Sequence, residues 1–247
     1  MGGEGGNNDY DSYVLVPMSS LILIPGLLCN RRMWSGQIAG LARYADITVA
    51  DITQQRTITE MAEAVLEISP DHFSLGGFSL GSQVALEIMR LSKARVDRLA
   101  LLSATRGGLL PSVEVAILRA VNLIGQGDFD QYLETAYSSY FAGQHAHNLL
   151  LKSCFFDMAH AVGSEAGLRQ MRALLAIGAP FENLSQIRCR TVIVGGRDDV
   201  RTTPAAHEAL AKEIPGSNLM IIDNAAHFTP LEQGEVVTSV LQDWMKD

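Results

Sequence analysis

The sequence has few cysteines, few positive charges and no long apolar run. Its three cysteines, Cys29, Cys154 and Cys189, are odd in number and widely spaced. This pattern predicts neither a disulfide framework nor a cysteine zinc site, and it favours a reducing, cytoplasmic location. No window holds the roughly 18 consecutive apolar residues that a membrane-spanning helix needs. We therefore expect no span across a membrane.

Positive charge is scarce. The chain has 19 Lys and Arg residues against 27 Asp and Glu, a net charge of −8. An acidic chain repels phosphate backbones and anionic lipid surfaces, so we expect neither nucleic acid nor a membrane as a partner. The segment 1–12 is rich in glycine and lacks the apolar core of a secretory signal. It is interpreted as a flexible lead-in.

Apolar residues with regular spacing are abundant. Of the 247 residues, 47% are hydrophobic, which is enough for one domain with a full core. Short strand-like runs alternate with segments of helical spacing, including 33–44 and 58–68. This order predicts an α/β fold with a mostly parallel sheet and helices on both faces. The predicted strands are residues 21–25, 47–50, 72–78, 96–102, 190–195 and 218–222, with 13–17 as a further antiparallel edge strand.

The alternation stops after Ser103, and no convincing strand follows before residue 190. The intervening chain carries apolar side chains at three- and four-residue spacing between glycine breaks. We therefore expect a helical cap insertion at 106–188, within an α/β core formed by 13–105 and 189–247. The predicted helices of this insertion are 111–124, 130–141, 148–162 and 165–177.

One serine lies in a distinctive turn pattern. Gly77-Phe78-Ser79-Leu80-Gly81 matches G-x-S-x-G, in which a sharp strand-to-helix turn lifts a serine hydroxyl above the sheet. The pattern alone is weak, but here it directly follows a strand-like run and directly precedes a helical one. The two glycines leave room for the strained serine backbone. Ser79 is therefore a candidate nucleophile.

A serine nucleophile needs a histidine base that a carboxylate orients, and the chain offers both further on. The strand-like run near 191–196 is followed by Asp198 and Asp199, and the run at 218–222 is followed by His227. The carboxyl ends of parallel strands meet at the sheet edge where ligands bind. The order Ser, Asp, His therefore predicts a triad of Ser79, His227 and either Asp198 or Asp199.

In these motifs the chain resembles the α/β-hydrolase superfamily, in particular its serine esterase-like members with a helical cap. The matching segments, in the family's order, are 21–28, 77–81, 196–204 and 226–228. The resemblance implies Ser79 as nucleophile, His227 as general base and acid, and Asp199 as the orienting carboxylate. In the family the acid usually follows the last glycine of its strand by three residues, and a proline follows the acid by about four. Gly196 and Pro204 fit this spacing better with Asp199 than with Asp198. The resemblance implies no cofactor and no metal.

The resemblance also implies two backbone N–H groups that would stabilise an oxyanion. One belongs to Leu80, the residue after the nucleophile, and the other to Leu27, which follows Pro25-Gly26. The family commonly has His-Gly where this chain has Pro-Gly. That change leaves the backbone donor in place but removes a hydrogen bond that helps to hold the loop.

The predicted cap is rich in Phe, Tyr, Leu and Met, which favours a mostly apolar pocket. We therefore expect a serine hydrolase that cleaves a small to medium, partly hydrophobic carboxylic ester or thioester through an acyl-enzyme. The alternatives are a triad-bearing ligand receptor, or a C–C bond hydrolase, perhydrolase or lyase on the same fold. The sequence selects no individual substrate and does not distinguish a monomer from a homodimer. The apolar cap residues include Leu123, Phe129, Tyr132, Tyr137, Tyr140, Phe141, Phe155, Phe156 and Met158.

His72, His160 and His207 lie outside the triad segments and are interpreted as structural, whereas His145 and His147 are expected on an exposed loop before a cap helix. The pair His145 and His147 lies at a spacing that does not share a helix face, and no cluster of acidic or cysteine ligands accompanies it. Cys29 follows the predicted oxyanion loop but has no supporting motif, so it is expected to be a small buried residue.

Overall fold

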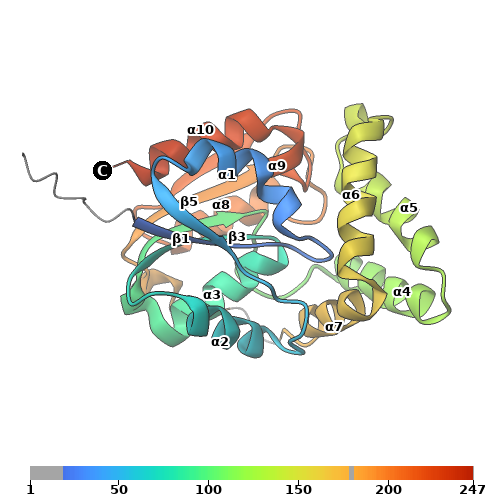
Figure 1. Cartoon of the computed structure of the whole chain (residues 1–247), viewed down its shortest axis with the longest axis horizontal. Helices are drawn as coiled ribbons and strands as arrows, with labels where there is room; N and C mark the ends of the chain where they lie inside the picture. Colours follow the sequence, from blue (N-terminus) through green and yellow to red (C-terminus); the bar gives the residue numbers. More distant parts are fainter. Residues whose placement is uncertain (1–18, 178–180, 247) are drawn as a thin grey trace, which may run out of the picture.

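The computed structural model describes residues 19–177 and 181–246 (Figure 1). The predicted lead-in at 1–12 and the predicted edge strand at 13–17 lie outside these residues. Six strands form one parallel sheet in the order β2-β1-β3-β4-β5-β6. The α/β fold class is confirmed. The strands are β1 Ser19–Ile24, β2 Ala45–Val49, β3 Phe73–Phe78, β4 Val96–Leu102, β5 Arg190–Gly196 and β6 Asn218–Ile222.

Helices cover both faces of the sheet. Each amphipathic helix that connects two parallel strands buries its apolar side against the sheet. In Figure 1, α1 (Ser35–Leu41) and α10 (Gly234–Met245) lie over one face, while α2 (Ile58–Ile68) and α3 (Leu80–Ser92) lie over the other. α8 (Pro204–Glu213) packs against β5 and β6, and α9 (Thr229–Glu232) is a single turn before α10.

Local sequence explains where these helices begin. Thr57 precedes α2, and its side chain accepts a hydrogen bond from the Glu60 N–H, which satisfies one of the unpaired donors of the first turn. The predicted helix at 33–44 is shorter than expected. Its start is a 3-10 turn, η1 (Arg31–Trp34), and α1 ends at Leu41, because the chain must extend again for β2.

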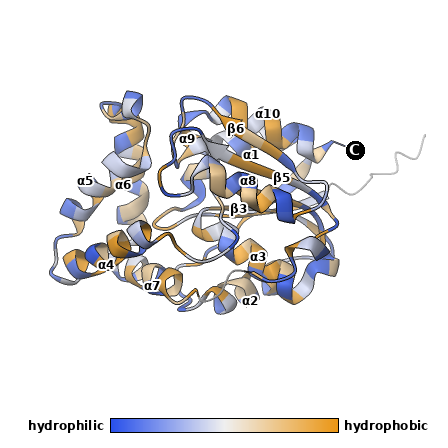
Figure 2. Ribbon diagram, turned by 180° about the vertical axis from the view of Figure 1, so that it is seen from behind, coloured by the Kyte–Doolittle hydropathy of each residue, from blue (hydrophilic) through white to orange (hydrophobic). Residues whose placement is uncertain are grey.

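The central strands form the core. Every residue of β3 is buried, and β4 and β5 are buried along most of their length. Strands covered on both faces are expected to be continuously apolar, unlike half-exposed strands that alternate. In Figure 2 the central strands are mostly hydrophobic, whereas the helices alternate between hydrophobic and hydrophilic segments.

Four helices occupy the long interval between β4 and β5, and the described part of that interval contains no strand. They gather at one side of the sheet (Figure 1). The helices are α4 Pro111–Gly125, α5 Phe129–Tyr140, α6 Leu149–Val162 and α7 Ser164–Leu175, and the short 3-10 turns of the chain are η2 Lys93–Arg95, η3 Gly143–His145 and η4 Leu184–Gln186.

Aromatic rings join this helical segment to the α/β core. The Phe141 ring, just after α5, stacks on Phe228 with centroids 4.8 Å apart, and Phe155 of α6 meets the same ring edge-on at 5.6 Å. Phe228 directly follows His227, so the helices pack against the loop that carries the histidine. In the described part of the chain, no helix has the length and apolar character to cross a membrane.

Candidate active site

The turn from β3 to α3 holds Ser79 in a strained conformation. Its φ is +52°, in a region that residues with a side chain seldom adopt, and its N–H donates to the Leu102 carbonyl at 2.9 Å. A Cβ on Gly77 would lie 2.3 Å from the Gly81 carbonyl oxygen, and a Cβ on Gly81 would lie 2.3 Å from the Ile24 oxygen. Both glycines are therefore required for the turn to close.

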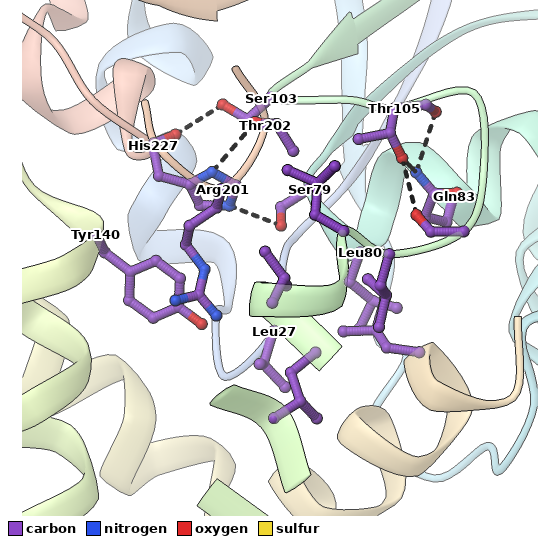
Figure 3. A pocket seen from close by; sticks show the side chains of 16 residues that line it. Leu27, Ser79, Leu80, Gln83, Ser103, Thr105, Tyr140, Arg201, Thr202 and His227 are labelled. Carbon is purple, nitrogen blue, oxygen red and sulfur yellow. Dashed lines mark hydrogen bonds between the residues drawn. The ribbon is translucent and has the colours of Figure 1, made fainter. Parts of the chain in front are cut away.

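Ser79, His227 and Asp199 form a continuous hydrogen-bonded relay. The Ser79 Oγ lies 2.9 Å from His227 Nε2 (Figure 3). On the other side of the ring, His227 Nδ1 lies 2.8 Å from Asp199 Oδ2. Asp199 also accepts hydrogen bonds from the Arg201 N–H at 2.8 Å, from the Thr202 N–H at 3.0 Å and from the Thr202 hydroxyl. The imidazole thus has an acceptor on one side and the serine hydroxyl on the other.

The structure distinguishes the two adjacent carboxylates. Asp199 is buried against His227, whereas Asp198 is exposed on the same loop. Burial alone would raise the pKa of the Asp199 carboxyl. The neighbouring His227 and the Thr202 donors outweigh burial and lower that pKa to about 2. Asp199 is therefore a carboxylate throughout the range in which enzymes normally work.

The lowered pKa of Asp199 predicts a pH-dependent contribution to stability. A carboxyl with a depressed folded-state pKa stabilises the fold above its unfolded pKa of about 4 and loses that contribution as the pH falls toward about 2. The stability advantage of wild type over Asp199→Asn should therefore shrink by about 2 kcal/mol between about pH 5 and pH 2. Denaturant titrations of both proteins across this range measure it, and a constant difference would contradict it.

His227 is held in place by groups from both the core and the helical segment. Its N–H donates to the Tyr140 carbonyl at 2.9 Å, and its own carbonyl accepts from the Ser103 hydroxyl at 2.7 Å. The imidazole stacks on the Tyr140 ring with centroids 5.4 Å apart and tilts against Phe78 at the same distance. Its orientation thus depends on residues from distant segments.

A buried carboxylate secures the same loop. Glu232 accepts hydrogen bonds from the N–H groups of Ala226 and Phe228, on either side of His227, at 3.1 and 3.0 Å. It also accepts from the Ala142 N–H, beyond the end of α5, at 2.7 Å. Burial raises the pKa of Glu232, although these donors oppose the shift. Glu232 therefore ties the histidine loop to the helical segment.

The two predicted oxyanion donors lie beside Ser79. Leu80 is the first residue of α3, where helix N–H groups have no partner within the helix, and both Leu80 and Leu27 line the pocket. The loop of Leu27 is held by Gln170 of α7, whose side-chain oxygen accepts from the Leu28 N–H at 2.9 Å. Gln170 itself donates to the Ile52 carbonyl. The loop thus has an anchor that the sequence did not reveal.

The pocket in front of Ser79 encloses about 560 Å³, including the solvent at its mouth. Part of this volume is the open mouth, so the enclosed space beside Ser79 is small. Among the described residues, the aliphatic lining consists of Leu27, Leu80, Leu109, Leu110, Val113, Ile117 and Leu174, and the polar lining includes Gln83, Ser103, Thr105, Tyr140, Arg201 and Thr202. Figure 3 shows Arg201 and Tyr140 on one side of Ser79, with Gln83 and Thr105 on the other.

The segment 106–188 supplies most of the aliphatic lining, through Leu109, Leu110, Val113, Ile117 and Leu174, but few of the larger side chains noted in the sequence take part. Of the nine aromatic, leucine and methionine residues that the sequence analysis named, Tyr140 is the one that lines this pocket among the described residues. Tyr137, Phe141 and Phe155 instead pack together and against Phe228. The apolar surface of the pocket comes from shorter aliphatic side chains, because these large rings pack between the helices and the core instead.

The other histidines and Cys29 lie apart from the relay. His207 is buried, and its two ring nitrogens lie 3.0 Å from the Thr203 carbonyl and 3.2 Å from the Ala104 N–H. Burial also lowers the pKa of His207, which favours its neutral form. His72 and His160 pair with aspartates at the surface. Burial raises the pKa of the Cys29 thiol far above its usual value, so its thiolate is disfavoured.

The described chain contains no group of three or more His, Cys, Asp or Glu side chains that could hold a metal ion. The groups gathered at Ser79 are a serine hydroxyl, an imidazole with a carboxylate behind it, and the backbone N–H groups at the start of α3. These are the parts of nucleophilic acyl transfer.

Comparison with known proteins places the chain among enzymes of this architecture. It is 25% identical, over 84% of its length and 85% of the relative's, to the putative carbamate hydrolase RutD of Rhizobium rhizogenes. It is 21% identical, over 84% and 88%, to a pimeloyl-[acyl-carrier protein] methyl ester esterase of Nitrosomonas europaea. Its fold resembles that of a thermophilic esterase from Thermogutta terrifontis, with a TM-score of 0.82, 21% identity, and coverage of 93% and 90%.

A family model supplies the assignment. The model of the alpha/beta hydrolase family matches residues 21–240, which include β1 from Leu21 onward and the other five strands of the sheet. The match also contains the strained serine turn and both strand ends that carry the relay. The chain therefore belongs to the α/β hydrolase family.

Proposed function

We propose that this protein is a serine hydrolase that cleaves a small to medium, partly hydrophobic carboxylic ester or thioester through an acyl-enzyme intermediate. The observation that carries the proposal is the relay from Ser79 through His227 to Asp199, which opens onto a small pocket with an aliphatic lining. The names of the relatives, a carbamate hydrolase and a methyl ester esterase, support hydrolysis at an acyl carbon.

In the first half of the reaction, Ser79 Oγ attacks the ester carbonyl carbon while His227 Nε2 accepts its proton. Asp199 holds the imidazole in the tautomer with Nδ1 protonated and stabilises the imidazolium that forms. The backbone N–H groups of Leu80 and Leu27 donate to the developing oxyanion. The imidazolium then protonates the departing alcohol or thiol, which leaves the acyl group on Ser79.

The second half repeats these steps with water. His227 accepts a proton as the water oxygen attacks the acyl-enzyme carbonyl, and the same backbone groups stabilise the second tetrahedral intermediate. The proton then passes from His227 to Ser79 Oγ as the carboxylic acid departs. Every step uses groups that are already positioned, so the proposal requires no cofactor.

The size of the pocket predicts a limit on acyl length. With p-nitrophenyl esters from acetate to decanoate, we expect the highest kcat/KM among the short and medium acyl groups. For decanoate we expect a decrease of at least about tenfold, because a long chain exceeds the aliphatic lining. Initial-rate assays with and without a chelator measure the series, and the chelator should have no effect.

A steady rise of kcat/KM to the longest ester would contradict the size limit while leaving the reaction type intact. Absence of turnover and of an acyl burst with every ester, together with tight binding of a small ligand, would instead favour a receptor. Cleavage of a C–C bond in preference to esters would assign the same triad to another reaction of the fold.

A further inference from the structure

The pocket contains a positive charge with no negative partner. Among the described residues that line the pocket, Arg201 is the one basic side chain other than His227, and none is an aspartate or glutamate. The nearby carboxylate of Asp199 is fully buried and bound to His227 and Thr202. A guanidinium keeps its charge in proteins, so this pocket carries a permanent cation beside Ser79.

The described contacts of the Arg201 guanidinium are weak and uncharged. One N–H donates to the Ser139 hydroxyl at 3.3 Å, and the guanidinium carbon lies 4.3 Å from the centre of the Tyr140 ring. No described carboxylate lies within ion-pair distance of it. By contrast, Arg197 on the same loop pairs with Asp223 at 2.7 Å on the surface. Arg201 therefore keeps most of its five N–H donors for another partner.

The backbone fixes where this charge lies. The Arg201 N–H donates to Asp199 Oδ1, so the residue belongs to the loop that supports the relay. Its side chain then runs beside Tyr140, the ring that stacks on His227 (Figure 3). Arg201 lines both this pocket and the adjoining one that contains Ser139, and an anion bound on its Ser79 side would lie on the His227 side of Ser79.

Partial burial of Arg201 favours a bound anion over solvent. Arg201 is half-buried, and a partly desolvated charge without a counter-ion is unfavourable unless something compensates for it. A planar guanidinium matches a carboxylate with two parallel hydrogen bonds. The net charge of −8 would repel anions at long range, so recognition would have to depend on this local contact.

We propose that Arg201 binds a carboxylate of the substrate, so that the enzyme selects short esters that also carry a carboxylate group. This inference rests on the proposed ester hydrolysis for its substrate class. The aliphatic lining then accommodates the rest of the molecule, and Arg201 supplies selectivity for the charged end. Arg201 is a specificity-determining residue in this scheme and takes no part in proton transfer.

Two pairs of probes test the proposal, each with a carboxylate compared with its neutral carboxamide. Monoethyl glutarate and its amide carry the group on the acyl side, while 4-acetoxybutanoate and its amide carry it on the alcohol side. For at least one pair, wild type should prefer the carboxylate in kcat/KM by at least about tenfold, the range of a charge-assisted hydrogen bond. Arg201→Met should bring that ratio near one, mainly through KM, and Arg201→Lys should restore part of it.

The control is Arg197→Met, which removes an equal charge from the same loop but from outside the pocket. It should leave the ratio unchanged, and thermal unfolding should show that all three variants are folded. The proposal would be overturned if the carboxylate-to-carboxamide ratio of kcat/KM were near 1 for both pairs in wild type. It would also be overturned if Arg201→Met left that ratio unchanged, even if neutral esters are hydrolysed.

Binding without turnover separates this proposal from the proposed reaction. Calorimetric titration of Ser79→Ala with the same four compounds should give a carboxylate preference that disappears in Ser79→Ala/Arg201→Met. If wild type hydrolyses none of the esters but this preference is found, the carboxylate site stands and the proposed hydrolysis fails. If the esters are hydrolysed and Ser79→Ala shows no carboxylate preference, the proposed hydrolysis stands and the carboxylate site fails.

Discussion

Replacing Ser79 with alanine is expected to lower kcat for ester hydrolysis by roughly 10⁶-fold, the loss typical of removing a triad nucleophile. The structure gives the reason, because the Ser79 Oγ is the group in hydrogen-bond contact with His227 Nε2 at the pocket surface. Steady-state assays with the best ester of the p-nitrophenyl series measure the loss. An irreversible fluorophosphonate should label wild type and fail to label the variant.

The matched control for this experiment is Cys29→Ser, which changes the other nucleophilic side chain near the predicted oxyanion loop. The Cys29 thiol is buried and donates to the Leu27 carbonyl at 3.3 Å, a bond that a serine can keep. We expect its activity to stay within a few-fold of wild type. Full activity in Ser79→Ala, or loss of activity only in Cys29→Ser, would refute Ser79 as the nucleophile.

Replacing Asp199 with asparagine is expected to lower kcat by about 10⁴-fold. An asparagine can present an N–H to His227 Nδ1, which favours the wrong imidazole tautomer and removes the charge that stabilises the imidazolium. The packing around residue 199 should change little, since aspartate and asparagine have nearly the same shape. The measurement is kcat for the same ester, with circular dichroism to establish that the variant is folded.

Asp198→Asn provides an adjacent control. Asp198 is exposed, and its backbone N–H donates to the Ala225 carbonyl, a contact that the substitution preserves. We expect kcat within about twofold of wild type, because exposed surface groups seldom affect a buried reaction centre. If Asp198→Asn were the inactive variant and Asp199→Asn the active one, the orienting role would move by one residue.

The strands and most helices could be predicted because burial leaves a periodic signal in the sequence. The predicted helix at 58–68 coincides with α2, whose buried side chains Ile58, Met61, Ala62 and Val65 follow the helical period. The region 33–44 misled the same reasoning. Apolar spacing there extends through a 3-10 turn and past the end of α1, and spacing alone does not separate these conformations.

The supports of the site were harder to predict. Gln170 and Glu232 have no motif of their own, and each acts by hydrogen bonding to backbone groups that are far away in the sequence or on a different element. Arg201 lies close to Asp199 in sequence, but nothing in the chain order indicates that its side chain enters the pocket. A search of the residues following the predicted acid would have found it as a candidate.

The parallel α/β architecture, the turn at Ser79, and the segments that carry the histidine and the acid could all be predicted from the amino-acid sequence. These features are local, because they depend on side-chain period and on glycines that tolerate close backbone contact. The contact between Asp199 and His227, which the motif spacing favoured over one from Asp198, and the side chains that line the pocket became visible only in the folded chain. Neighbouring loop residues point in different directions, and the pocket is assembled from segments that meet only when the helices pack onto the sheet.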